Sequence, residues 1–205
     1  MLVLQGFQNL VGMAFVKQKN IKVKLEPLMK GGMYHIYNRG INGGAIFIND
    51  ENKNYFLKLV NKYLIQECGV YAYCLMDNHF HFLLEINSDE TEVTQSLSNL
   101  FNAYAKAFNK SETRTGSLFE KHFKRIRIED ETYLRQLIVY IHLNPEHHLR
   151  SDYTKFKFSS YNSILSEKSS SLKRKEILEL FGGCDNFEFV HRERKVFLDE
   201  KFTFE

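Results

Sequence analysis

Apolar and polar residues alternate over several short stretches of this chain, which is the pattern of half-buried β-strands. The clearest stretches are "MYHIYNR" at 33–39, "VYAYCLM" at 70–76 and "HFHFLLEI" at 79–86. Only "DN" separates the last two, which is typical of a hairpin turn. A fourth strand, long and basic, is predicted for "SLFEKHFKRIRI" at 117–128.

Between these stretches, apolar residues recur every three or four positions and predict three amphipathic helices. The first begins at Asn49 or Asp50 and ends by Gly69, and the second covers 91–110. The third helix, "DETYLRQLIVYIHLN", is expected to begin after Asp130 and to stop before Pro145.

The order of these elements, β-α-β-β-α-β-α, predicts an α+β fold, a ferredoxin-like antiparallel sheet with helices on one face. We expect the folded domain to span 33–165. The flanking parts are interpreted as an N-terminal extension at 1–32 and, at 166–205, a linker, a short helix and a charged tail.

Composition narrows the picture only a little. A length of 205 residues suits one domain, and a net charge of +3 does not by itself specify a partner. Three cysteines without a C-x-x-C pair fit a reducing, cytoplasmic setting. We expect no signal peptide and no membrane partner, because no apolar run approaches the ~20 residues of a membrane span.

Two histidines, His79 and His81, interrupt the apolar run at 79–86. Side chains alternate between the two faces of a strand, so Phe80 and Phe82 share the apolar face and both histidines point from the other. Two neighbouring neutral imidazoles suit a divalent cation, or could contact a phosphate oxygen. Paired histidines on a sheet surface are also often incidental, so a site needs a third ligand and a reactive group.

The predicted helix before Pro145 offers both. Tyr140 and Asn144 lie one turn apart, on a stripe beside the apolar face of that helix. A cation held by His79, His81 and Asn144 would polarise a phosphodiester for attack by Tyr140, whose hydroxyl is a weak nucleophile without such activation. The covalent phosphotyrosine would conserve the bond energy for rejoining. The alternative is an amphipathic tyrosine at the core margin and an asparagine that ends a helix.

Other residues compete for these roles. Tyr104 is a rival nucleophile, but it shares a helical stripe with leucines and phenylalanines, which favours core packing. His35 could approach the site from the first strand, although a simple strand position is the favoured interpretation. His142, His147 and His148 are interpreted as residues of an exposed helix end.

Five basic residues are candidates for DNA contacts: Arg39, beside the glycine-rich "GINGG", and Lys121, Lys124, Arg125 and Arg127 in the predicted fourth strand. Alternation would place Lys121, Arg125 and Arg127 on one face of that strand and Lys124 on the other. Clustered Lys and Arg suit a phosphate backbone, but a solvated strand face would look the same.

Six blocks in order carry a resemblance that covers about Met33 to Leu165: "YHIYNRG", "AIFINDENKNYFLKLV", "YAYCLMDNHFHFLLE", "GSLFEKHFKR", "YIHLNP" and "FKFSSYNSIL". In these blocks the chain resembles the HUH single-strand tyrosine transposases, specifically their REP-associated (RAYT-like) branch. The resemblance implies the HUH nuclease fold and a Mg²⁺ or Mn²⁺ ion held by His79, His81 and Asn144. It further implies attack by Tyr140 on single-stranded DNA beside a foldback hairpin, leaving a 5′-phosphotyrosine and a free 3′-OH.

The chain also departs from these relatives. They usually have Pro where Asp77 stands, Trp where Phe156 or Phe158 stands, and a Val-Arg-Ala-Gly-like turn where this chain has "EHHLR". Two other functions stay open: a non-catalytic hairpin-binding protein derived from a transposase, and a plasmid-type replication initiator or relaxase, although the chain has no P-loop pattern. A monomer and a homodimer are both compatible with the sequence.

Overall fold

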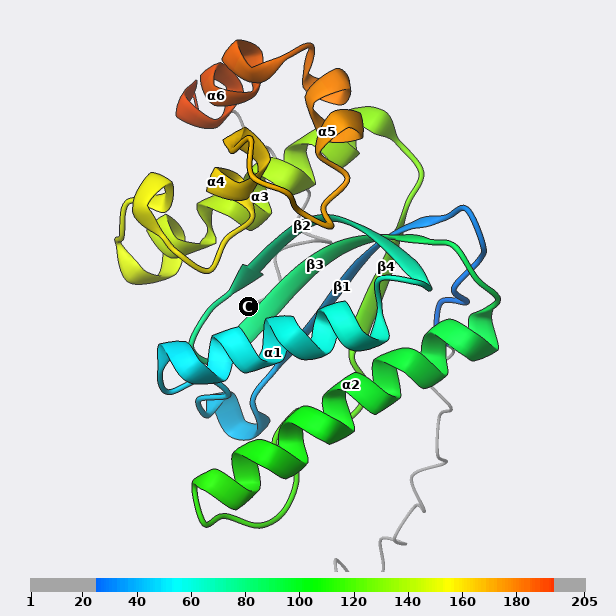
Figure 1. The fold of residues 1–205 in the computed structure, drawn as a ribbon, viewed down its shortest axis with the longest axis vertical. Helices are drawn as coiled ribbons and strands as arrows, with labels where there is room; N and C mark the ends of the chain where they lie inside the picture. The colour runs from blue at the N-terminus through cyan, green and yellow to red at the C-terminus, as the bar shows by residue number, and fades with distance from the viewer. Residues whose placement is uncertain (1–24, 194–205) are drawn as a thin grey trace, which may run out of the picture.

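The protein, described by a computed structural model over residues 25–193, is built on one antiparallel sheet (Figure 1). The strands are β1 (Met33–Arg39), β2 (Cys68–Leu75), β3 (His79–Ile86) and β4 (Lys124–Ile128), in the order β2-β3-β1-β4. The helices are α1 (Asp50–Tyr63), α2 (Glu90–Ser111), α3 (Glu131–Leu149), α4 (Tyr161–Leu165), α5 (Arg174–Phe181) and α6 (Cys184–Glu193), with short 3-10 turns η1 (Ile41–Gly43) and η2 (Tyr153–Lys155). None of the helices in this range has the length and apolar character to cross a membrane.

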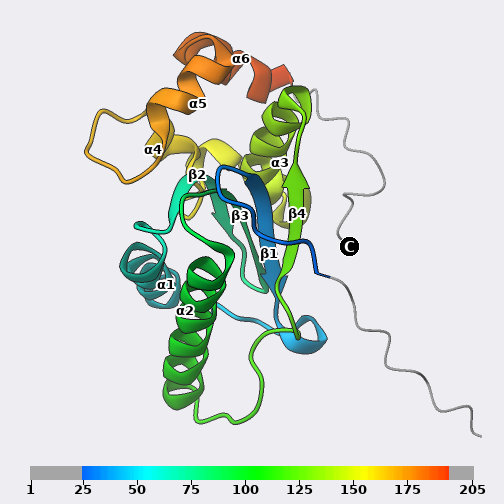
Figure 2. The same cartoon turned by 90° about the vertical axis from the view of Figure 1, so that its right-hand side faces the viewer.

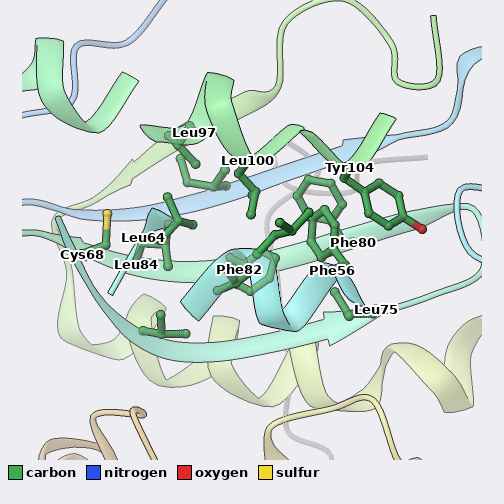
Figure 3. Close-up of a cluster of buried hydrophobic side chains, with 14 of the residues drawn as sticks. Phe56, Leu64, Cys68, Leu75, Phe80, Phe82, Leu84, Leu97, Leu100 and Tyr104 are labelled. Carbon is green, nitrogen blue, oxygen red and sulfur yellow. The ribbon is translucent and has the colours of Figure 1, made fainter. Parts of the chain in front are cut away.

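The predicted α+β fold is confirmed, and one face of the sheet is covered by α1 and α2 as expected (Figure 2). Phe80 and Phe82 of β3 point to this face and pack with Phe56 of α1 and Tyr104 of α2 (Figure 3). The ring centroid of Phe56 lies 5.3 Å from that of Phe80 and 4.9 Å from that of Tyr104. The alternation along 79–86 therefore sends its phenylalanines into the core.

The opposite face of the sheet is also covered, by α3 and the C-terminal helices (Figure 2). Leu137, Ile138 and Ile141 of α3 are buried in a second core that includes Ala72 of β2 and Leu83 of β3. The sheet thus lies between two helical layers, where we expected helices on one face. This second layer matters for function because it covers the face from which His79 and His81 point.

The fourth strand is shorter than predicted, because regular pairing begins only at Lys124. His122, just before it, has a positive φ of 58°, which interrupts the extended backbone. Arg125 and Arg127 pair with residues of β1 that face α1 and α2, whereas Lys124 faces the α3 side. Lys121 precedes the strand, so the predicted basic face that would include Lys121 is wrong.

The third helix does not stop at Pro145, as we predicted, but continues to Leu149. A proline removes one backbone hydrogen bond, yet its φ is compatible with a helix and the next turn closes normally. The N–H of Arg150, in the left-handed conformation (φ 50°), donates to the carbonyls of Glu146 and Pro145 at this end. The additional turn brings His148 to the face of α3 that carries Tyr140 and Asn144.

Residues 166–193 contain two helices, α5 and α6, where we predicted a linker, one short helix and the start of a charged tail. Helix α6 is joined to α3 through buried side chains. His191 Nδ1 lies 2.7 Å from the carbonyl oxygen of Phe187, and His191 Nε2 lies 2.8 Å from His142 Nδ1. His142 Nε2 lies 2.7 Å from Ser160 Oγ. The parts of the predicted extension and tail at 1–24 and 194–205 lie outside the described residues.

The Phe187 carbonyl fixes which atom donates in each of these three hydrogen bonds. A carbonyl only accepts, so His191 Nδ1 carries the proton and His191 Nε2 accepts from His142 Nδ1. His142 Nε2 must then accept from the Ser160 hydroxyl. Burial lowers the pKa of His191 to about 4 and that of His142 well below 6.5, so both rings are neutral near pH 7. His142, interpreted from sequence as an exposed helix-end residue, is buried.

Candidate active site

A cleft of about 520 Å³ lies between the sheet and α3, on the face opposite the phenylalanine core. It is lined by Tyr37, Asn38, Arg39, Met76, Asp77, Asn78, His79, His81, Lys124, Tyr140, His148 and Leu149. The cleft therefore brings together the two histidines of β3, the tyrosine of α3 and two of the basic residues singled out in the sequence.

His79 is oriented by Asn78. The Nδ2 of Asn78 lies 3.5 Å from the carbonyl of Gly43, which it donates to, so its Oδ1 accepts from His79 Nδ1 at 2.7 Å. In the neutral ring, the lone pair is then on His79 Nε2. That atom lies 3.3 Å from Asn144 Oδ1.

Asn144 is oriented by its own helix. Its Nδ2 donates to the backbone carbonyl of Tyr140 at 2.9 Å, so Oδ1 is the atom that faces His79. Two atoms with lone pairs, His79 Nε2 and Asn144 Oδ1, thus face the same space, which suits a cation. Adjacent ligands of an octahedral Mg²⁺ would be about 3 Å apart. The side chain of Asn144 is buried, where a helix-ending asparagine would be exposed.

His81 is buried beneath α3, with 3% of its surface exposed, where we expected an outward-facing ring. Its Nδ1 lies 2.9 Å from Nε2 of His35, which is fully buried. Burial lowers the pKa of His35 to about 3. Burial and the neighbouring imidazoles of His35, His79 and His148 hold the pKa of His81 well below 6.5. His81 is therefore neutral, which is the form that binds metals.

Tyr140 lies beside His81, and its ring centroid is 5.6 Å from that of His81 in an edge-on arrangement. The rival, Tyr104, is 1% exposed and belongs to the core on the other face of the sheet. Its hydroxyl donates to the carbonyl of Ile46 at 2.6 Å, and burial raises its pKa. Only Tyr140 of these two is placed to reach a group bound at the histidines.

The five basic candidates separate into two groups. Arg39 and Lys124 line the cleft, and Arg39 Nε pairs with Glu120 at 2.6 Å. Arg125 and Arg127 project from the other side of β4, and Lys121 is exposed on the segment before this strand. Arg39 and Lys124 are thus the two that lie beside the histidines and Tyr140.

Two histidines of this region, His35 and His148, were given other roles in the favoured sequence interpretation. His35 contacts His81 because β1 pairs with β3 in a register that sets Tyr37 opposite His81, with His35 diagonal to it. The sequence allowed His35 to approach the site, but the register could not be predicted from it. His148 lines the cleft, with its ring centroid 5.0 Å from that of His79. It was interpreted as an exposed helix-end residue because Pro145 was expected to end the helix.

Within residues 25–193, no group of three or more His, Cys, Asp or Glu side chains is arranged to hold a metal ion. A divalent ion here would have to take an amide oxygen, and Asn144 provides one beside His79. Two imidazoles and an amide oxygen suit Mn²⁺ and related cations. The residues present therefore fit a metal site made by His79, His81 and Asn144.

Comparison with known families gives the identity of the chain. The profile of the family described as Transposase IS200 like matches residues 29–144, more than half of the sequence. The chain belongs to the IS200-like transposase family. The matched residues end at Asn144, so they include β3 with His79 and His81, and also Tyr140. No curated protein matches the sequence of this transposase-family chain.

A solved structure shows the same fold. A REP-associated tyrosine transposase, solved bound to a REP hairpin, is 15% identical, with a TM-score of 0.54 over 69% of this chain and 84% of that one. A tRNA(His) guanylyltransferase from Saccharomyces cerevisiae is 13% identical, with a TM-score of 0.42 over 87% of this chain and 83% of that one. The first likeness agrees with the α+β fold of this chain. The second is too distant to support an argument.

Proposed function

We propose that this IS200-like transposase cleaves and rejoins single-stranded DNA beside a hairpin, through a 5′-phosphotyrosine on Tyr140 and with Mg²⁺ or Mn²⁺. The observation that supports this most directly is the pair of facing acceptors, His79 Nε2 and Asn144 Oδ1 at 3.3 Å, in the cleft that Tyr140 lines. His81, neutral and in the same cleft, is the third ligand in this proposal. The bound ion would withdraw charge from the scissile phosphate.

The reaction is a transesterification. Tyr140 Oη attacks the phosphorus, the bond from phosphorus to the 3′ oxygen breaks, and the tyrosine proton ends on the departing 3′ oxygen through solvent. The cleaved strand keeps its 5′ phosphate on Tyr140, and a free 3′-OH can reverse the reaction on the same or another strand. No net hydrolysis occurs, which is what rejoining requires.

Arg39 and Lys124 contact the phosphates next to the cleaved one in this proposal. Both line the cleft, Arg39 from the end of β1 and Lys124 from the start of β4, where it pairs with Tyr37. A hairpin as the recognised DNA is supported by the REP hairpin bound to the structural neighbour. Such phosphate contacts set affinity and position without reading sequence.

The experiment that tests the proposal is mapping of the covalent adduct. The full chain is incubated with a library of single-stranded hairpin DNAs and Mn²⁺, and the modified peptide is identified by mass spectrometry. We expect the adduct on Tyr140, and none with Tyr140→Phe, which removes only the hydroxyl. Tyr133→Phe is the matched control because Tyr133 is a partly buried tyrosine on the same helix.

Metal dependence is tested with the same assay. His81→Ala should lose both the adduct and Mn²⁺ binding while hairpin binding persists, because the phosphate contacts lie elsewhere. An adduct on Tyr133 or Tyr104, or one that forms equally well with the chelator EDTA present, contradicts the proposal. Hairpin binding without any adduct across the whole library would make the chain a non-catalytic hairpin-binding protein.

A further inference from the structure

A second concave surface lies on the opposite side of β1 from the cleft. We call it the α2–β4 groove; it has a volume of about 650 Å³ and lies between α2 and the segment that leads into β4. Its aromatic wall is formed by Phe101, Phe119 and Phe123, which are partly buried. Asn38 lines both the groove and the cleft, so the two adjoin at the end of β1.

Arg125 lines the groove, and its charge is incompletely neutralised. Its side chain is 7% exposed, and its guanidinium lies over the Phe123 ring at 4.8 Å. The carboxylate beside it, Glu90, is 3.6 Å from Nη1, and the same Glu90 oxygen accepts from the N–H of Leu28. The Nε of Arg125 is buried without a hydrogen-bond partner among the described residues.

A buried guanidinium with one long ion pair and an unused N–H is unfavourable by itself. It becomes favourable when a ligand brings an acceptor oxygen or nitrogen to Nε. The Phe123 ring and the guanidinium plane provide flat surfaces for stacking beside that position, and Phe101 and Phe119 extend the aromatic wall of the groove. An acceptor joined to a flat aromatic ring is the chemistry of a nucleotide, whose bases stack on Phe and Arg.

We propose that the α2–β4 groove binds an unpaired nucleotide of the single-stranded DNA that extends from the cleft. This inference rests on the proposed function for the identity of the DNA, but the groove binds whether or not cleavage occurs. The strand passes the end of β1 at Asn38, and a base enters the groove and stacks beside Phe123. Arg125 Nε donates to an acceptor of the same nucleotide, so the groove adds affinity for the unpaired flank of a hairpin.

The test compares a DNA hairpin without a flank with the same hairpin carrying a short unpaired flank on its 5′ or 3′ side. Affinities are measured by fluorescence anisotropy with the full chain in EDTA, so that metal-dependent cleavage does not interfere. We expect one of the flanks to tighten binding of the wild type. Arg125→Met should remove that gain, about tenfold for one stacked base, and leave the affinity for the bare hairpin unchanged.

Two further variants make the result specific. Arg127→Met removes an equal charge from the same side of β4, where the side chain is 42% exposed and paired with Glu129, and should keep the gain. Ser98→Phe fills the groove from α2 without touching the charge of Arg125 and should lose the gain. It also keeps the test informative if Arg125→Met, checked by thermal unfolding, does not fold.

Three results would overturn the inference: no gain from either flank in the wild type, a gain retained in Ser98→Phe, or an equal loss in Arg127→Met and Arg125→Met. Failure of the proposed function is seen separately. It would appear as the absence of the Tyr140 adduct with Mn²⁺, whereas the groove is measured by binding without metal.

Discussion

Two pairs of buried histidines lie in this protein. They differ in the contacts of the ring nitrogens that do not take part in the hydrogen bond within the pair. In the pair His142–His191 every ring nitrogen has a partner, because the chain of bonds runs from the Phe187 carbonyl to the Ser160 hydroxyl. In the pair His35–His81, the 2.9 Å bond uses one nitrogen of His81, and the same ring lines the cleft.

The difference separates a structural role from a binding role. A closed network satisfies its buried polar groups within the protein, so it stabilises the packing of α6 on α3 and has no capacity for a ligand. A pair that ends at a cleft can offer a nitrogen to a ligand while its inner bond holds the ring in place. Burial and low pKa are common to both pairs, so neither property alone indicates function.

The largest effect that would sharpen this comparison is expected at His35. For His81 Nε2 to bind a cation, His81 Nδ1 must carry the proton and donate it to His35 Nε2. His35→Leu should therefore weaken Mn²⁺ binding by about 10–100-fold, measured by electron paramagnetic resonance of free Mn²⁺. His35→Gln, whose Oε1 can accept the same bond, should retain most of the affinity.

The His35 variants need a separate measure of folding. Thermal unfolding without metal reports the packing cost, which the metal titration does not. If Leu and Gln weaken Mn²⁺ binding equally, His35 does not orient His81 through this hydrogen bond. Tyr37→Phe is the matched control, because it alters a residue stacked on His35 but keeps the aromatic ring and the His35–His81 hydrogen bond.

A smaller effect, on stability only, is expected at His191. His191→Leu leaves the Nδ1–H of His142 buried without its acceptor, at a cost of about 1–3 kcal/mol in the free energy of unfolding. Chemical denaturation measures this loss, and Mn²⁺ affinity should stay that of the wild type. A large loss of Mn²⁺ affinity in this variant would mean that the closed pair also supports the cleft, and the distinction between the two pairs would fail.

The smallest expected effect is on the pH dependence of the free energy of unfolding. The pKa of His191 is about 4 in the folded protein against 6.5 ordinarily, so below pH 6.5 the unfolded chain binds a proton that the folded chain does not. Its contribution is fully present above pH 6.5 and is lost as the pH falls toward 4, by at most about 1.4 kcal/mol per pH unit. Unfolding free energies measured from pH 7 to 5 should decline less steeply in His191→Leu. Equal slopes would contradict the assignment of this loss to His191.

Local patterns predicted much of this protein. Asn49 caps α1, and the alternation at 79–86 assigns His79 and His81 to one face. The predictions were wrong where tertiary packing overrode a local sequence signal. Pro145 is a strong stop signal in isolation, but α3 continues through it to Leu149, and the turn before the proline is held in the second core by Ile141 and Leu143.

The sequence by itself determined the order of the four strands and first three helices, the two faces of β3 and the neighbouring positions of Tyr140 and Asn144, because these depend on periods of two and 3.6 residues within one segment. The tertiary structure alone decided that His35 meets His81, that Asn144 faces His79 and that Arg125 is buried in a groove. Each of these contacts joins residues far apart in the chain. Strand register and helix docking set them, and both are governed by long-range packing that a local period does not encode.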